Sequence, residues 1–133
     1  MPASGETPAN LAYLKSGRIG DGVIPFVFEK IFTASTTTSY LVTVAAFRFR
    51  VINAFTINAS APAGVATVQV MNGTTAVSSA INCNVADETI ALTTTIDDAS
   101  DVFNPGDTMN LAIAGANAAN LAARVYIMCI PIE

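Results

Sequence analysis

Short segments in which apolar and polar residues alternate, separated by turn residues, run through most of this 133-residue chain. The clearest lies within residues 102–115, where Met109, Leu111 and Ile113 alternate with small or polar neighbours. A period of two is typical of a strand that buries one face and exposes the other. Residues 105–107, Pro-Gly-Asp, supply a preset φ, a tolerated positive φ and a capping carboxylate. The sequence therefore predicts a turn followed by a half-buried strand.

The same alternation predicts about eight strands, frequent turns and no long helix. We therefore expect an all-β protein, folded as a single-domain antiparallel β-sandwich. A count of about eight strands favours a jelly roll. An immunoglobulin-like sandwich is the alternative, although the chain has no tryptophan for its core. The other expected strand regions are residues 25–33, 40–58, 65–71, 74–81, 88–97 and 121–132.

Three local features refine this expectation. Asn72-Gly73 predicts a type I′ hairpin turn, because both residues tolerate positive φ. The alternation slips at residues 51–53, which indicates a bulge where the strand passes between sheets. Within residues 88–97 the larger apolar side chains are expected to face inward and the threonines outward. The residues expected to face inward there are Ile90, Leu92 and Ile96.

Residues 1–24 differ from the domain expected over residues 25–133, because proline and glycine punctuate them. They predict an extended N-terminal arm, which either frays in solvent or lies on a neighbouring subunit. The large apolar residues of this arm are candidate contacts, namely Leu11, Tyr13, Leu14 and Ile19. The first residues lack a signal-peptide pattern, so we expect synthesis in a reducing cytoplasm.

The chain is rich in hydrophobic residues, at 52%, and poor in charged residues, at 12% against about 25% in ordinary soluble domains. No uninterrupted apolar run approaches the roughly 18 residues of a membrane span, so no membrane partner is expected. Two interpretations remain: a soluble domain with a neutral surface, or a subunit whose faces are covered by copies of itself or by a host surface. Low charge favours the second, because interface cores are depleted of charge.

Six basic residues and a net charge of −4 argue against a nucleic-acid partner. Nucleic-acid binders carry a basic stripe, whereas these residues are scattered along the chain. They are Lys15, Arg18, Lys30, Arg48, Arg50 and Arg124.

The chain has no histidine, which excludes Ser-His and Cys-His nucleophile pairs. A Ser-Lys pair with Lys15 or Lys30 has no supporting motif. Cys83 and Cys129 are too few for structural zinc and are expected to be buried free thiols. We therefore expect no enzymatic activity, no cofactor and no small-molecule substrate.

Four aspartates form the densest acidic cluster in the sequence: Asp97, Asp98, Asp101 and Asp107. We expect them to be solvated turn and capping residues, which is the usual role of loop aspartates. Two alternatives remain open, calcium binding and glycosidase-type acid–base catalysis.

Arg48 and Arg50 alternate with Phe47 and Phe49, so the two residue types face opposite sides of a strand. The phenylalanines are expected in the core and the arginines outward, in solvent or at an interface. The last strand is apolar on both faces, with Tyr126 on one of them, and is expected to be central or covered by another chain.

Residues 45–130 resemble small bacteriophage virion proteins of the head-decoration and head-fibre kind. The resemblance lies in the segment FRFRVINAFTINASAPAGVATVQVMNGTTAVSSAI, in IALTTTIDDASDVFNPGDTMNLAIAG and in AARVYIMCIPIE. The F-x-x-G-D element, from Phe103 to Asp107, is similar to one found in trimeric jelly-roll and tumour-necrosis-factor-like modules.

This resemblance implies a cement role on the outer surface of a virion. Homotrimers would sit at three-fold or quasi-three-fold positions of the capsid lattice and clamp the major capsid protein. The alternative function is a receptor- or glycan-binding module of a phage head or tail fibre.

Overall fold

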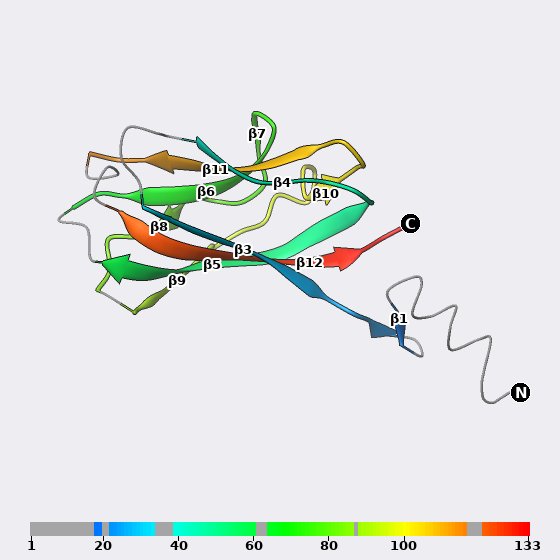
Figure 1. Cartoon of the computed structure of the whole chain (residues 1–133), viewed down its shortest axis with the longest axis horizontal. Helices are drawn as coiled ribbons and strands as arrows, with labels where there is room; N and C mark the ends of the chain where they lie inside the picture. The colour runs from blue at the N-terminus through cyan, green and yellow to red at the C-terminus, as the bar shows by residue number, and fades with distance from the viewer. Residues whose placement is uncertain (1–17, 20–21, 34–38, 61–63, 87, 117–120) are drawn as a thin grey trace, which may run out of the picture.

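The computed structural model describes residues 18–19, 22–33, 39–60, 64–86, 88–116 and 121–133. These residues form strands and turns and contain no helix, which confirms the expected all-β class. Two antiparallel sheets of five strands each form the two layers visible in Figure 1. The expected number of about eight strands is close to these ten. In each sheet, two short strands pair with the same edge of one longer strand and can be counted as one interrupted strand.

The first sheet is built on the long strands β5 (Phe49–Ser60) and β12 (Ala122–Pro131). β12 lies between β5 and β3 (Phe26–Thr33), and β3 is an edge strand. On the other side of β5, β9 (Ile90–Leu92) and β10 (Val102–Phe103) pair with different parts of its length. We call this the β12 sheet. The central position of β12 agrees with the expectation for a strand that is apolar on both faces.

The second sheet, which we call the β11 sheet, has β11 (Thr108–Ala114) between β4 (Ser39–Val44) and β6 (Thr67–Asn72). β7 (Thr75–Ala76) and β8 (Ile81–Asn82) both pair with the other edge of β6. Both sheets therefore have one continuous edge strand, β3 or β4, and one edge made of two short strands.

A further antiparallel pair, β1 (Arg18–Ile19) and β2 (Gly22–Val23), precedes β3. In Figure 1 this pair lies beyond the start of β3, to the right of the two layers. The rest of the expected arm lies outside the described residues. The candidate contacts Leu11, Tyr13 and Leu14 are therefore not placed by the structure.

One buried cluster draws inward-facing side chains from both sheets. Met109 and Leu111 of β11 and Ile127 of β12 have no exposed surface, as the alternation predicts. Phe49 and Phe103 stack within this cluster with ring centroids 5.1 Å apart. The expectation that Phe47 is also in the core is wrong, because it lies in the link before β5 and is 48% exposed. Because each sheet contributes one face to a shared core, the opposite face of each sheet is left outward.

The turn before β11 forms as predicted. Gly106 has a φ of 93°, and the Asp107 carboxylate accepts a hydrogen bond from the Asn104 amide at 2.9 Å. The same turn exchanges two backbone hydrogen bonds with Ala45, each of 2.8 Å, through the amide of Gly106 and the carbonyl of Asp107. It thereby holds the segment in which the chain leaves β4 for β5.

That segment corrects one expectation. Residues 40–58 were expected to pass between the sheets at residues 51–53, but they do so at residues 45–48, between β4 and β5. The bulge itself is confirmed, because the register with β12 skips Ile52 between Val51 and Asn53. The crossing lies earlier because Ala45 is bound to the turn before β11.

The hairpin at Asn72-Gly73 also forms, shifted by one residue. Asn72 pairs with Thr75, so the loop consists of residues 73–74. Gly73 has a φ of 60° and takes the first loop position, the one that requires glycine in a type II′ turn. The expectation that Asn72 and Gly73 together form the loop is therefore wrong.

The expected orientation of β9 is wrong as well. Ala91 faces inward, while Ile90 and Leu92 are exposed. The register on β5 explains this, because Ala91 is paired with Thr56, whose side chain is fully buried. Ile96 packs partly buried against the core, as expected.

Candidate interaction surface

The outward side of the β12 sheet holds two of the residues predicted to make contacts, Arg50 and Tyr126. Arg50 lies on β5, where its register partner on β12 is Ile130. Tyr126 is paired with Phe55 of β5, and their rings stack with centroids 5.1 Å apart. Arg48 is not part of this surface, because it lies in the link before β5 and donates a hydrogen bond to the Glu133 carbonyl.

The strand registers align the outward side chains of this sheet into rows that cross β3, β12, β5 and β9. One row consists of Ile31, Arg124, Ile57 and Ile90. The next consists of Glu29, Tyr126, Phe55 and Leu92. Val27 and Met128 begin a third row. Residues up to a hundred positions apart in sequence thus become neighbours across one sheet.

Most of these side chains are hydrophobic, and the outermost are exposed. Val27, Ile31, Ile90 and Leu92 keep between 51% and 65% of their surface in solvent. We call this surface the apolar face. It consists of Val27, Ile31, Phe55, Ile57, Ile90, Leu92, Tyr126 and Met128. A contiguous exposed patch of this kind marks a protein-interaction site more often than scattered apolar residues do.

Two ion pairs hold the arginines of this sheet. Arg124, in the first row, lies 2.8 Å from the carboxylate of Glu88. Arg50, near one end of the sheet, lies 3.3 Å from the carboxylate of Asp101. The carboxylate of Glu29 raises the pKa of the Tyr126 phenol, mainly through hydrogen bonding. The polar groups of this surface therefore interact with each other and leave the apolar residues as its main feature.

The outward side of the β11 sheet has a different character. Its register rows are short and mix polar with apolar residues: Ser39, Ala112 and Gln69 form one, and Leu41, Asn110 and Met71 form the next. None of the five strands of this sheet contains a charged residue. We call this surface the neutral face.

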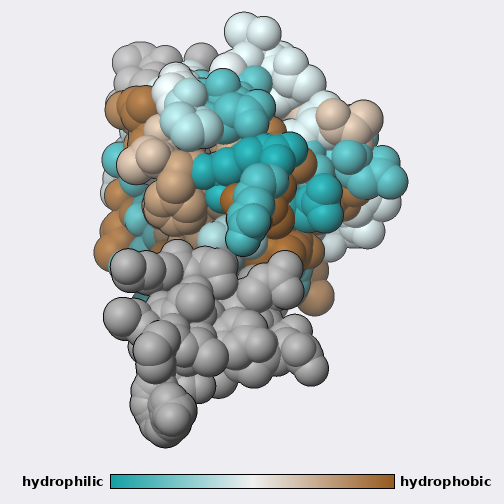
Figure 2. Space-filling model, turned by 90° about the vertical axis from the view of Figure 1, so that its right-hand side faces the viewer, coloured by the Kyte–Doolittle hydropathy of each residue, from teal (hydrophilic) through white to brown (hydrophobic). Residues whose placement is uncertain are grey.

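The end of the molecule between these faces is mixed. Figure 2 looks at the end that lies to the right in Figure 1, and hydrophilic and hydrophobic side chains are interspersed there. Hydrophilic residues gather in the middle of this view.

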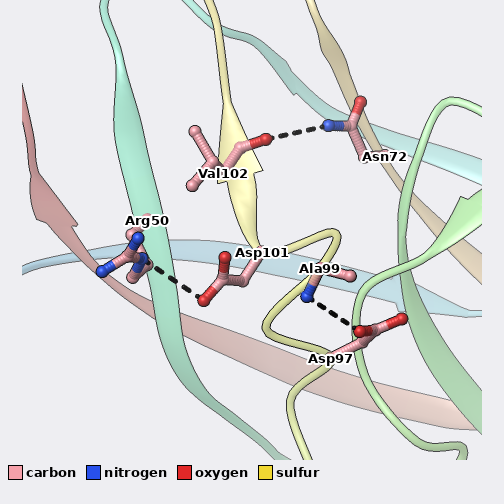
Figure 3. A network of polar contacts seen from close by, with 6 residues as sticks. All are labelled: Arg50, Asn72, Asp97, Ala99, Asp101 and Val102. Atoms are coloured by element: carbon pink, nitrogen blue, oxygen red, sulfur yellow. Dashed lines mark hydrogen bonds and ion pairs between the residues drawn. The ribbon is translucent and has the colours of Figure 1, made fainter.

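The loop aspartates cap turns, as expected, with one exception. The Asp97 carboxylate accepts a hydrogen bond from the Ala99 amide at 2.9 Å (Figure 3). Asp98 is exposed. Asp101 is buried instead of solvated, with 6% of its surface exposed, and one of its carboxylate oxygens, Oδ1, has no hydrogen-bond partner. Figure 3 shows its other oxygen directed at the side chain of Arg50, which lies on β5.

The two chemical alternatives for these aspartates gain no support. Within the described parts of the chain, no three acidic or cysteine side chains lie close enough to hold a metal ion. A polar pocket of about 290 Å³ lies beside the β6–β7 hairpin, and Asp107 is the one aspartate that lines it. The Asp107 carboxylate is already bound by the Asn72 side chain at 3.3 Å. A glycosidase needs two carboxyl groups facing one bond, and this pocket offers one.

Both cysteines are buried free thiols, as predicted. Burial raises the pKa of Cys129 to about 12. Burial also raises the pKa of Cys83, and hydrogen bonds with Thr56 and the Val68 backbone lower it by a smaller amount. Because the thiolate is the reactive form, neither cysteine is equipped as a nucleophile.

Comparison of the chain with protein-family models, with curated proteins and with solved structures found no match. No helix among the described residues is long and apolar enough to cross a membrane. The two sheet faces and the sequence are thus the features of this chain that bear on its function.

Sequence reasoning missed the apolar face as a unit. The alternation of β3 did separate Val27 and Ile31 from the inward phenylalanines. Ile90 and Leu92 were assigned to the core because they are large and apolar. A usable signal was Ala91, since a small residue between two large ones fits an inward position opposite a crowded strand.

Proposed function

We propose that this chain is a structural protein of a bacteriophage virion, a decoration or cement protein that binds the outside of the head and stabilises the lattice of the major capsid protein. The observation that supports this most is the apolar face. A surface with exposed Ile31, Ile90 and Leu92 side chains gains free energy when it is buried against another protein. A chain of this kind acts by binding protein surfaces, not by transforming a small molecule.

The proposed fold within this function is a jelly-roll β-sandwich. The strand pairs are nested, in the order β3 with β12, β4 with β11, β5 with β9 and β10, and β6 with β7 and β8. Counting each of the two short pairs as one interrupted strand gives eight successive strands, which alternate between the sheets except at β6 and the β7–β8 pair, which share the β11 sheet. A long hairpin rolled into two sheets has this order, which supports the jelly roll over the immunoglobulin-like alternative.

The proposed partners are other copies of the chain, as a homotrimer, and the major capsid protein. Residues 1–24 would serve as the arm that reaches a neighbouring subunit. An interface of standard size buries about 1,600 Å² in total. Several linked copies on one lattice would add avidity without further contacts.

The alternative function, a receptor- or glycan-binding module, has one supporting observation, the polar pocket beside the β6–β7 hairpin. Its lining includes Thr75, Ser100 and Asn104, which are suitable hydrogen-bond partners for a sugar. No aromatic side chain is among the residues that line it, and a sugar ring stacks on such side chains. We therefore rank this function second.

Co-sedimentation with phage heads tests the proposal. Purified protein is mixed with undecorated heads of the phage that encodes it, and the pelleted protein is measured at rising concentration. We expect saturation at a fixed ratio to the major capsid protein and heads that resist heat better. Protein that stays in the supernatant at every concentration would contradict the proposal, and specific binding to a glycan array would favour the alternative.

A further inference from the structure

The apolar face is assembled from four strands, and its most exposed residues lie at its two sides. Val27 and Ile31 belong to β3, and Ile90 and Leu92 belong to β9, with Phe55 and Tyr126 stacked between them. Hydrophobic side chains therefore extend across the full width of the sheet. Removing them from water would contribute about 25 cal/mol for each Å² of apolar surface.

The size of this face suits one half of a stable interface. β3, β12 and β5 are 8, 10 and 12 residues long, and β9 adds 3 residues. With strands about 4.8 Å apart and about 3.4 Å per residue, their whole outward side has a flat area on the order of 500 Å². Side-chain relief makes the accessible area larger than the flat area. A standard interface needs about 800 Å² of accessible surface from each partner. The outward side of these strands, with the apolar face at its centre, thus supplies a large part of what a self-association interface requires.

The charges of the face allow two copies to meet. Arg124 and Arg50 each have an acidic partner within the same chain, so neither brings an uncompensated cation. The carboxylate of Glu29 lies beside the Tyr126 hydroxyl. No ion pair is found for Glu29 among the described residues, so its carboxylate remains available to a cation of a second copy. Arg124 lies in the next row, and its own partner Glu88 is exposed, so Arg124 could supply that cation.

We propose that a second copy of this chain covers the apolar face, so that copies associate through the outward side of the β12 sheet in a closed homo-oligomer. This inference rests on the proposed function for the expectation that the chain works in several copies. It adds the surface that joins them. Contacts with the major capsid protein would then be made by other surfaces of the oligomer, and the neutral face remains free for them.

The test is the mass of the full chain in solution, measured by light scattering during size-exclusion chromatography. One chain has a mass of 13.7 kDa. We expect the wild type to elute at two or three times this mass and Leu92→Lys to fall to the single-chain mass or to dissociate at least tenfold more readily. The matched control is Leu41→Lys on the neutral face, since Leu41 is 52% exposed and Leu92 is 60% exposed. Its mass should equal that of the wild type.

Ile31→Lys, at the opposite side of the face, provides a second variant if Leu92→Lys fails to fold, which circular dichroism would report. Dissociation of either variant supports the inference. A wild type at 13.7 kDa at every concentration overturns it. A mass that neither apolar-face substitution changes overturns it as well.

Capsid binding by the same variants separates this inference from the proposed function. A wild-type oligomer that dissociates on Leu92→Lys but never binds heads leaves the inference standing and overturns the decoration role. A single-chain wild type that binds heads, and loses binding on Leu92→Lys, assigns the face to the capsid protein and overturns the inference.

Discussion

The two outward faces of this molecule use the same strand geometry for different surfaces. The neutral face mixes Ser39, Gln69 and Asn110 with apolar side chains such as Leu41, and its strands carry no charge. The apolar face carries Ile31 and Leu92 at comparable outward positions, with most of their surface exposed. Strand alternation alone requires only one buried face per sheet. The second hydrophobic face is therefore not explained by the folding of a single chain, and it points to another protein surface.

If this comparison is sound, the inward sides of the two sheets should be equivalent. Leu111→Ala in β11 and Ile127→Ala in β12 each remove a fully buried side chain at the middle of a sheet. We expect each to lower the free energy of unfolding by about 3 kcal/mol, within the range of about 2–5 kcal/mol for such deletions. Urea denaturation measures this. A loss below about 1 kcal/mol for one sheet alone would show that the sheets do not share one core.

The two buried thiols, Cys83 and Cys129, should affect stability at high pH to different extents. The folded pKa of Cys129 is raised from 9.0 to about 12, so unfolding releases a proton between these values. Stability from this group is complete below pH 9 and is lost as the pH rises towards 12. We expect the melting temperature to fall above pH 9 and Cys129→Ala to flatten that fall.

The control is Cys83→Ala. Burial raises the pKa of Cys83 too, but hydrogen bonds oppose the rise, so this variant should flatten the dependence of melting temperature on pH less than Cys129→Ala does. Equal pH profiles for the wild type and Cys129→Ala would contradict the account of burial.

The two ion pairs at the borders of the apolar face should differ in their contribution to stability, because they differ in burial. Asp101 is buried beside Arg50, whereas Glu88 beside Arg124 is 69% exposed. Asp101→Asn should cost about 1 kcal/mol, at the low end for a charged hydrogen bond because Arg50 is half exposed. Glu88→Gln should cost at most about 0.5 kcal/mol. Thermal unfolding of both variants measures the difference, and the reverse order would refute this assignment of burial.

The smallest effect is expected on the neutral face. Leu41→Thr on β4 replaces an exposed side chain on the uncharged neutral face, so the free energy of unfolding should change by less than about 0.5 kcal/mol. Denaturant titration at two protein concentrations should give the same midpoint shift. A large, concentration-dependent shift would show that this face also joins copies.

Much of the fold could be predicted, because alternation and turn chemistry are local. The burial of Met109 and Leu111 and the turn containing Gly106 follow from a few neighbouring residues. The inward choice of Ala91 could not be predicted, since it depends on how β9 aligns with β5. Register between distant strands decides which side chains share a face.

The candidate surface was predictable only in part for the same reason. Arg50 was predicted to face outward and Tyr126 to make contacts, but their common face appears only when β5 and β12 are paired. The ion pair of Arg50 with Asp101 joins residues fifty positions apart, and sequence spacing gives no sign of it. Physical proximity across a sheet is set by the whole topology.

The most direct test of the central claim, that the apolar face is covered by protein in the working state, is covalent footprinting of the native full chain with a solvent-borne radical or carbene label. Ile31 and Leu92 report on the apolar face, and Leu41 on the neutral face serves as the internal reference. The account predicts that Ile31 and Leu92 are labelled several-fold less than Leu41, although all three are comparably exposed in the isolated chain. Equal labelling of the three residues at concentrations where the protein is functional would contradict it.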